Sequence, residues 1–287
     1  MDILISGFLL GGTYILIAMG LNLQYGVARI MNLANGEMIV LGALASFWIF
    51  TSSAVSPLLT VFIVFPIAFV GNWFIYRFLL LPLVRRAKNQ GHLEVDAILA
   101  TFGMSFILVG LVVSMNGGYF TYSFLATPFD ILGSTVALNR FVAFVFAAVI
   151  GLALYVWLNR SRAGTAVRAV AVNPDSARLV GINVEKISAL AFAIGGAISA
   201  VAGVLISTFI TLDASVGVIF TMKALIIVIM GGVGDVRGAV IAALILGLVE
   251  TTVATLIDPG LTLASAYFIF LLILLFRPQG LFGKPQT

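Results

Sequence analysis

The sequence predicts an all-α polytopic membrane protein. Of its 287 residues, 62% are hydrophobic and only 9% are charged, and the mean hydropathy is +1.20. Soluble domains carry about 25% charged residues and could not keep so apolar a surface in water. The apolar stretches recur at lengths near the ~20 residues that a helix needs to cross the hydrocarbon core. The alternating ten-residue pattern of an outer-membrane barrel is absent.

About eight or nine transmembrane helices are expected, in a single transmembrane domain over residues 1–287. The N-terminus, MDILISGFLL, lacks the basic region and small-residue cleavage site of a secretory signal, so the first segment is expected to remain as a span. The 29 glycines suit close helix packing. The predicted spans are 3–21, 37–51, 58–81, 97–115, 137–158, 187–211, 217–230, 238–257 and 261–276.

Lys and Arg in the short connections predict the orientation, because cytoplasmic loops retain them. Segments 82–96 and 159–186 are basic and should be cytoplasmic, whereas 116–136 contains neither Lys nor Arg and should face outward. The same counting places Arg237, Arg277, Lys284 and the C-terminus in the cytoplasm and the N-terminus outside. If residues 22–36 crossed the bilayer fully, the N-terminal side would invert.

The longest polar interruption, 159–186, reads NRSRAGTAVRAVAVNPDSARLVGINVEK. Its first part, Gly164 to Val172, is rich in Ala and suits a helix. Asn173 followed by Pro174 predicts an N-cap and a first helical residue. The second helix should then end near Gly181, at the position that glycine favours.

Two capped helices at the cytoplasmic face would present a compact surface to another protein. A small apolar face, formed by Ala169, Ala177 and Val180, favours such a docking element. The alternative is a solvated basic loop that only fixes the orientation of the neighbouring spans.

The stretch RAVAVNPDSARLVGI, residues 168–182, resembles the cytoplasmic coupling segment of the permeases of branched-chain amino-acid ABC importers. Three further stretches resemble the same family, in the same order along the chain. They are LNLQYGVARIMNLANGEMIVLGA at 21–43, IMGGVGDVRGAVIAALILGLVE at 229–250 and LLFRPQGLFGK at 274–284.

The resemblance implies a subunit that pairs with a second, homologous permease and sits on two ATP-binding subunits. It also implies a bacterial or archaeal cytoplasmic membrane as the location, and an extracytoplasmic substrate-binding protein that delivers the cargo. By default the cargo would be leucine, isoleucine or valine, although similar permeases carry other amino acids, urea or short amides. The residues that would couple ATP hydrolysis to transport are Arg168, Asn173, Asp175, Ala177, Arg178 and Gly181.

One turn departs from the family pattern. Where the family commonly has a neutral Gly-Ser-Ile-Pro-Gly-like turn, this chain has Gly234-Asp235-Val236-Arg237-Gly238. A local pair of Asp235 and Arg237 is expected there.

No enzyme chemistry is predicted. The glycine-rich GGVGDVRG at 231–238 lacks the Lys-Ser/Thr that ends a phosphate-binding loop, and GLFGKP at 280–285 has the wrong spacing. With one histidine, His92, and no cysteine, neither a metal site nor a cofactor is expected. The basic residues lie beside the spans instead of forming one stripe, so nucleic acid is not an expected partner.

A stand-alone ion-coupled carrier or channel is the main alternative, because such proteins place ionisable groups inside their spans. Lys223 and Glu250 are the two candidates. Their depths from the outer ends of their spans differ by only ~3 Å at 1.5 Å per residue. They could form a structural ion pair, line the pathway separately, or make no contact.

The stretch QYGVARIMNLANGE, residues 24–37, interrupts two apolar runs. A discontinuous helix is predicted near 22–37, with Asn35 as N-cap of the second part and Glu37 in its first turn. Interrupted helices often bind substrate, because their freed backbone groups need polar partners. The candidate pathway residues are Asn22, Asn32, Asn35 and Glu37. The alternatives are a double cap at the cytoplasmic surface and a simple loop in water.

Overall fold

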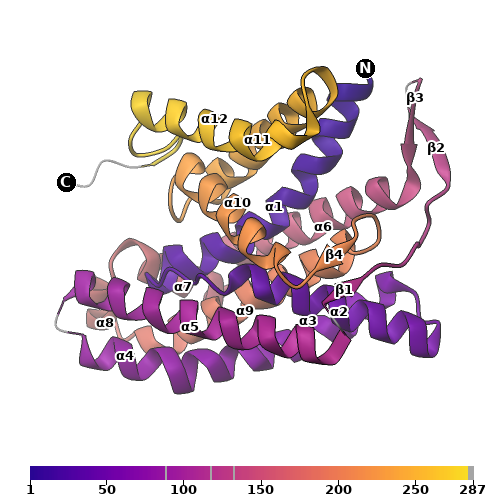
Figure 1. Cartoon of the computed structure of the whole chain (residues 1–287). Helices are drawn as coiled ribbons and strands as arrows, with labels where there is room; N and C mark the ends of the chain where they lie inside the picture. Colours follow the sequence, from indigo (N-terminus) through magenta and orange to yellow (C-terminus); the bar gives the residue numbers. More distant parts are fainter. Residues whose placement is uncertain (88, 117, 132, 284–287) are drawn as a thin grey trace.

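The computed structural model describes residues 1–87, 89–116, 118–131 and 133–283, and it is a bundle of long helices (Figure 1). Within the described residues, eight helices are long and apolar enough to cross a membrane, and α10 is a shorter apolar helix. The predicted all-α class is confirmed. Lys88 and Lys284 lie outside the described residues. The helices are α1 (Asp2–Ala28), α2 (Asn35–Ser53), α3 (Pro57–Ile75), α4 (Leu81–Arg86), α5 (Gln90–Asn116), α6 (Leu138–Arg160), α7 (Arg162–Val172), α8 (Pro174–Leu179), α9 (Val184–Ile206), α10 (Val216–Gly231), α11 (Val236–Leu256) and α12 (Thr262–Phe276).

Helix α9 forms the centre of the bundle and packs against α1, α2 and α3. In an apolar stretch of 18 residues of α9, 89% of the residues are buried. Glycines allow this close approach: a Cβ atom at Gly203 would overlap the carbonyl oxygen of Ile39, and one at Gly42 would overlap that of Ala200. Small residues are expected at helix interfaces in membranes, because they let the backbones approach closely where lipid tails are as apolar as the side chains.

The connection expected over 82–96 is mostly helical. Helix α3 runs through a π-helical turn, Tyr76–Leu80, into α4, and α5 already begins at Gln90. The wider turn precedes Pro82, whose ring and missing N–H disturb regular α-helical hydrogen bonding. The non-helical part of this connection is therefore shorter than the charge pattern predicts.

Short strands occupy the segment between α5 and α6. Strand β1 (Tyr119–Phe120) pairs antiparallel with β4 (Leu212–Asp213), and β2 (Pro128–Ile131) forms a hairpin with β3 (Ser134–Ala137). The hydroxyl of Tyr122 lies 2.8 Å from those of both Ser46 and Ser207, which ties this segment to α2 and α9. Burial raises the pKa of Tyr122.

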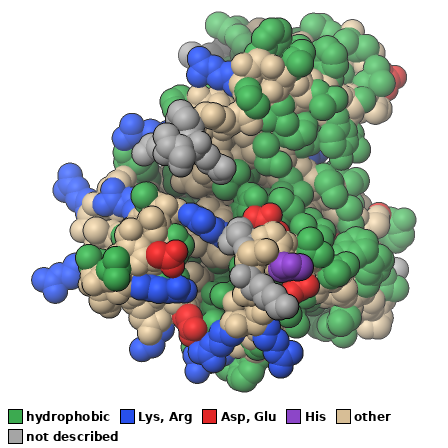
Figure 2. Space-filling view, turned by 90° about the vertical axis from the view of Figure 1, so that its left-hand side faces the viewer, with side chains coloured by type: hydrophobic (Ala, Val, Ile, Leu, Met, Phe, Trp, Pro, Cys, Tyr) green, Lys and Arg blue, Asp and Glu red, His purple; other side chains and the backbone are tan. Residues whose placement is uncertain are grey.

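The two ends of the bundle differ in charge. Helices α7 and α8 lie at one end, and the β2–β3 hairpin projects from the other (Figure 1). Viewed from the α8 side, Lys and Arg side chains gather over the surface (Figure 2). We call these the basic end and the hairpin end.

Candidate functional site

A break between α1 and α2 lies where the sequence predicts a discontinuous helix. Helix α1 continues through Gly26 to Ala28, and Arg29 then adopts a left-handed conformation with φ of 54°. Residues 30–34 run without regular structure back into the protein, with Ile30, Asn32 and Ala34 fully buried. Asn35 is also buried, so a simple loop in water is excluded.

Asn22 holds the turn between α10 and α11. Its Nδ2 donates to the carbonyl oxygen of Asp235 at 3.2 Å, and its Oδ1 accepts from the N–H of Gly234 at 2.7 Å. Gly26 packs against the same turn, since a Cβ there would lie 2.7 Å from the Cα of Gly234. Gly26 therefore serves close packing and does not break the helix.

Asn32 stabilises the broken segment internally. Its Nδ2 donates to Oε1 of Gln24 at 3.0 Å, while its Oδ1 accepts from the N–H of Ala34 at 3.1 Å. Gln24 in turn donates to the carbonyl oxygen of Phe192 in α9 at 3.2 Å. Both ends of the Asn32 amide are thus engaged in holding the break against the bundle.

Asn35 and Glu37 keep unpaired polar atoms. Ser199 of α9 donates to Oδ1 of Asn35 at 2.8 Å, but Nδ2 of Asn35 has no partner among the described residues. Glu37 is 1% exposed, and neither carboxylate oxygen has a described partner. Its carboxylate lies against Gly217 of α10. Buried polar atoms are normally hydrogen-bonded, so these atoms stand out from most of the described interior.

The expected N-cap role of Asn35 is wrong. Ala34 is the N-cap of α2 and makes no side-chain hydrogen bond, and Asn35 is the first helical residue. The N–H of Gly36 instead donates to the hydroxyl of Thr221 at 2.8 Å. Because Thr221 lies on α10, one N–H in the first turn of α2 is satisfied by a tertiary contact, which a local capping pattern does not reveal.

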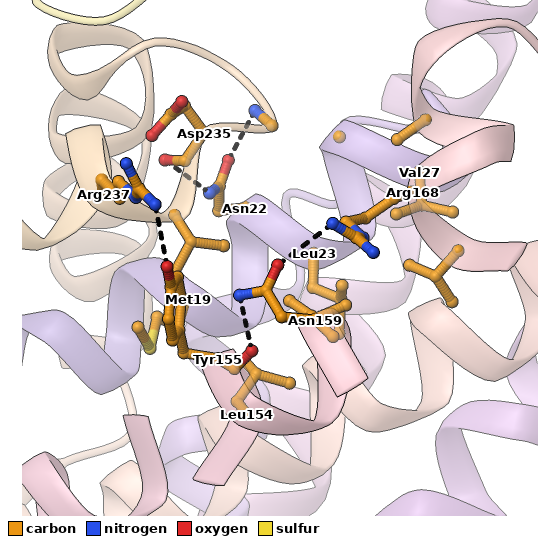
Figure 3. A pocket seen from close by; sticks show the side chains of 16 residues that line it. Met19, Asn22, Leu23, Val27, Leu154, Tyr155, Asn159, Arg168, Asp235 and Arg237 are labelled. Atoms are coloured by element: carbon orange, nitrogen blue, oxygen red, sulfur yellow. Dashed lines mark hydrogen bonds between the residues drawn. The ribbon is translucent and has the colours of Figure 1, made fainter. Parts of the chain in front are cut away.

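A cavity of about 240 Å³ lies at the basic end among α1, α6, α7 and the turn after α10 (Figure 3). Arg168 donates to Oδ1 of Asn159 at 3.1 Å, and Asn159 donates to the carbonyl oxygen of Tyr155 at 3.0 Å. Asn22 reaches the cavity from α1. These bonds join α7 to α6 at the wall of a cavity that the α10–α11 turn also lines.

Asp235 and Arg237 do not form the expected pair. Asp235 caps α11, since its Oδ1 accepts from the N–H of Gly238 at 2.8 Å. Arg237 donates to the hydroxyl of Tyr155 at 2.9 Å, and its guanidinium lies over that ring at 5.8 Å. Each charge has its own structural partner, and no salt bridge joins them in the described structure.

The α7–α8 segment has the capped geometry that its sequence predicts. Oδ1 of Asn173 accepts from the N–H groups of Asp175 and Ser176, both at 3.0 Å. Arg178 makes an exposed salt bridge of 3.2 Å to Asp175. Gly181 has a φ of 82°, a left-handed conformation that favours glycine.

The apolar face expected on this segment needs correction. Ala177 is 3% exposed and packs into the hydrophobic core, so it anchors α8 to the bundle. Val180 is exposed as expected, and the exposed apolar side chains beside it are Val172 and Leu179, with Leu179 at 89%. We call these three the docking face.

Lys223 and Glu250 are in contact. Nζ of Lys223 donates to Oε2 of Glu250 at 2.7 Å and to the hydroxyl of Tyr14 at 2.6 Å. The Tyr14 hydroxyl donates to the same Oε2 at 2.6 Å. The alternative in which the two charges make no contact does not hold. Tyr14 is the third residue of this cluster, and the sequence does not predict it. A tyrosine within an apolar span gives no indication of the polar group that its hydroxyl contacts.

Comparison with known proteins identifies the family. The model of the family described as "Branched-chain amino acid transport system / permease component" matches residues 3–277. The chain belongs to this family. The high-affinity branched-chain amino acid transport system permease protein LivH of Escherichia coli (strain K12) is 30% identical, over 98% of this chain and 95% of LivH. The corresponding BraD of Pseudomonas aeruginosa is 28% identical, over 99% and 96%.

A solved structure supports the fold alone. PsaBC from Streptococcus pneumoniae in complex with Fab has a TM-score of 0.50 and 10% sequence identity, and the match covers 98% of this chain and 94% of that one. Together with the eight apolar helices, the family makes this chain a multi-pass inner-membrane permease subunit of the ABC importer class. Its homologues are transport subunits, and ATPase and permease partners are implied. A stand-alone carrier is not favoured.

Proposed function

We propose that this chain forms half of the translocation pathway of an ABC importer for branched-chain or other hydrophobic amino acids. The cargo is suggested by the family description and by the names of LivH and BraD. Hydrolysis of ATP in two partner subunits drives the transport. The observation that carries the proposal is the capped α7–α8 segment, which presents an exposed docking face at the basic end.

One ATP-binding subunit docks on the α7–α8 segment. Val172, Leu179 and Val180 supply an apolar centre, and the exposed Arg178 and Asp175 border it, as in interfaces with an apolar core and a polar rim. Arg168, Asn173 and Gly181 fix the shape of the segment. The basic end, with α7, α8 and the C-terminus, is cytoplasmic, and the N-terminus is outside, as the excess of Lys and Arg indicates.

The pathway runs beside the α1–α2 break. The unpaired atoms of Asn35 and Glu37 support a position at which a polar group of the cargo or of the partner is received. Asn22 and Asn32 hold the break in place through their own hydrogen bonds. A second, homologous permease completes the pathway, and an extracytoplasmic binding protein delivers the cargo at the hairpin end.

Reconstitution tests the proposal. The chain is assembled in proteoliposomes with the second permease, the ATPases and the binding protein, and ATP-dependent uptake of leucine is measured. Leu179→Asp should abolish co-purification of the ATPase and reduce uptake at least about tenfold, because it places a charge in the apolar docking face.

Ile257→Asp is the matched control. Ile257 is also an exposed aliphatic residue, but it lies at the end of α11 away from α8, next to Asp258. Unchanged ATPase binding by Leu179→Asp, or uptake by the chain alone without ATP, would contradict the proposal.

A further inference from the structure

A second cavity, of about 320 Å³, lies at the hairpin end between α1, α6 and α11. Its walls are mainly apolar, with Leu9, Leu10, Phe209 and Ala254 among them. Two charged side chains, Arg140 and Glu250, also line it. The volume falls at the lower end of the ~300–1,000 Å³ that is usual for small-molecule sites. The cavity is therefore large enough for one small molecule.

Glu250 lines this cavity and keeps one buried carboxylate oxygen without a described donor. Its Oε2 accepts from both Lys223 and Tyr14, whereas Oε1 has no hydrogen-bond partner among the described residues. The residue is only 3% exposed. A buried carboxylate oxygen without a donor is costly, so an incoming N–H group would be stabilised there.

Arg140 offers the opposite charge. It lies in the first turn of α6, and its guanidinium lies over the ring of Phe209 at 5.9 Å. It is exposed and forms no salt bridge with a described residue. The other described Lys and Arg residues, apart from Lys223, lie toward the basic end, so Arg140 stands alone in the opposite half. A planar guanidinium can bind a carboxylate through two parallel hydrogen bonds.

We propose that this cavity is a binding site for a small zwitterion with an apolar side chain, that is, an α-amino acid. Arg140 binds its carboxylate, Oε1 of Glu250 accepts from its ammonium group, and the apolar walls receive its side chain. The inference rests on the proposed function and deepens it, because it places a contact for the cargo in the permease itself.

The balance of charge predicts which analogues bind. Arg140, Lys223 and Glu250 together carry one net positive charge. An amine without a carboxylate is repelled by this charge, and a carboxylic acid without an amine leaves Oε1 of Glu250 without a donor. Both halves of the zwitterion are therefore required.

The test measures binding of radiolabelled leucine to the complete transporter in nanodiscs, without the binding protein. Leucine should bind saturably, and 4-methylpentanoate and 3-methylbutylamine should compete about 10-fold to 100-fold more weakly, as expected for the loss of a charged hydrogen bond. Arg140→Gln and Ala254→Phe should each weaken leucine binding at least about tenfold. Neither variant disturbs the Lys223 contact, as Glu250→Gln would.

Arg77→Gln is the matched control, because Arg77 also places a guanidinium over an aromatic ring, Trp73, at 5.9 Å. It should bind leucine as the wild type does. Wild-type leucine binding by both Arg140→Gln and Ala254→Phe would overturn the site. So would the detection by native mass spectrometry of phosphatidylethanolamine, another zwitterion, bound in an Arg140-dependent way while leucine fails to bind.

Uptake measured on the same preparations separates the two proposals. If ATP-dependent leucine uptake is normal but no leucine binds the complex without the binding protein, the cavity site is wrong and the proposed function stands. If leucine binds in an Arg140-dependent way but is not transported with ATP, the proposed function is wrong and the site stands.

Discussion

The contact between Lys223 and Glu250 predicts a strong energetic coupling between two membrane helices. Only 13% of the Lys223 side chain and 3% of the Glu250 side chain are exposed, and their charged atoms lie 2.7 Å apart. Replacing one partner, as in Lys223→Met or Glu250→Gln, leaves the other with a buried and uncompensated polar group. Replacing both residues removes both buried charges, so neither is left without its partner.

The magnitude follows from burial. Removing one member of a buried ion pair typically costs about 3–5 kcal/mol. For a domain of this size that corresponds to a fall in the melting temperature of roughly 6–20 °C, at about 2–4 °C per kcal/mol. The double variant Lys223→Met/Glu250→Gln should lose at least about 2 kcal/mol less than the sum of the two single variants.

Thermal melting of the purified protein, followed by the fluorescence of its three tryptophans, measures these differences. The control is the pair Arg85 and Glu185, which has the same distance of 2.7 Å but side chains that are 61% and 41% exposed. Because exposed pairs contribute only about 0–1 kcal/mol, Arg85→Gln should melt almost as the wild type does. Additive losses at Lys223 and Glu250, or equal losses at the two pairs, would refute the reasoning.

Three further predictions follow from contacts elsewhere in the bundle. Gly203→Ala should prevent close packing of α9 and lower the yield of folded protein. Gly103→Ala is the control and should not lower the yield, because a Cβ added there meets nothing within 4 Å. Equal yields of the two variants would contradict this packing. Asn173→Ala should destabilise α8 by about 1 kcal/mol, because it removes the N-cap. ATPase-coupled uptake should fall while the melting temperature of the bundle stays unchanged. Unchanged uptake would show that the cap is dispensable. Asn22→Leu should accelerate amide hydrogen exchange at residues 232–235, because it removes both hydrogen bonds that hold this turn; unaltered exchange would place the restraint elsewhere.

Features that depend on a short stretch of sequence could be predicted. The spans follow from apolar length, and most predicted boundaries lie within a few residues of the helices. The capped start of α8 follows from the adjacent Asn173 and Pro174, since capping is a local interaction. The break lies within the predicted segment 22–37, although it begins at the left-handed Arg29 and not at a glycine.

Features that depend on packing could not be predicted. The side of α8 that faces the bundle is decided by its tertiary contacts, so Ala177 was expected on the apolar surface but is buried. Thr221 replaces the expected cap of α2 from nearly two hundred residues away in the sequence. The unpaired oxygens of Glu37 become visible only once every neighbouring donor is placed.

Helix α9 lies between the docking face and the α1–α2 break and contacts the helices of both. Asn183 caps α9 by accepting from the N–H of Lys186 at 3.0 Å, so α8 and α9 are separated by only a short, well-held turn. Ser199, which donates to Asn35, lies about 22 Å along the axis from the start of α9 at 1.5 Å per residue. A helix transmits displacement along its axis, and the close glycine contacts prevent α2 from sliding independently. Under the proposed function, a movement imposed on α8 by an ATPase would reach Asn35 through its hydrogen bond to Ser199, at the position where the bundle leaves polar atoms unpaired.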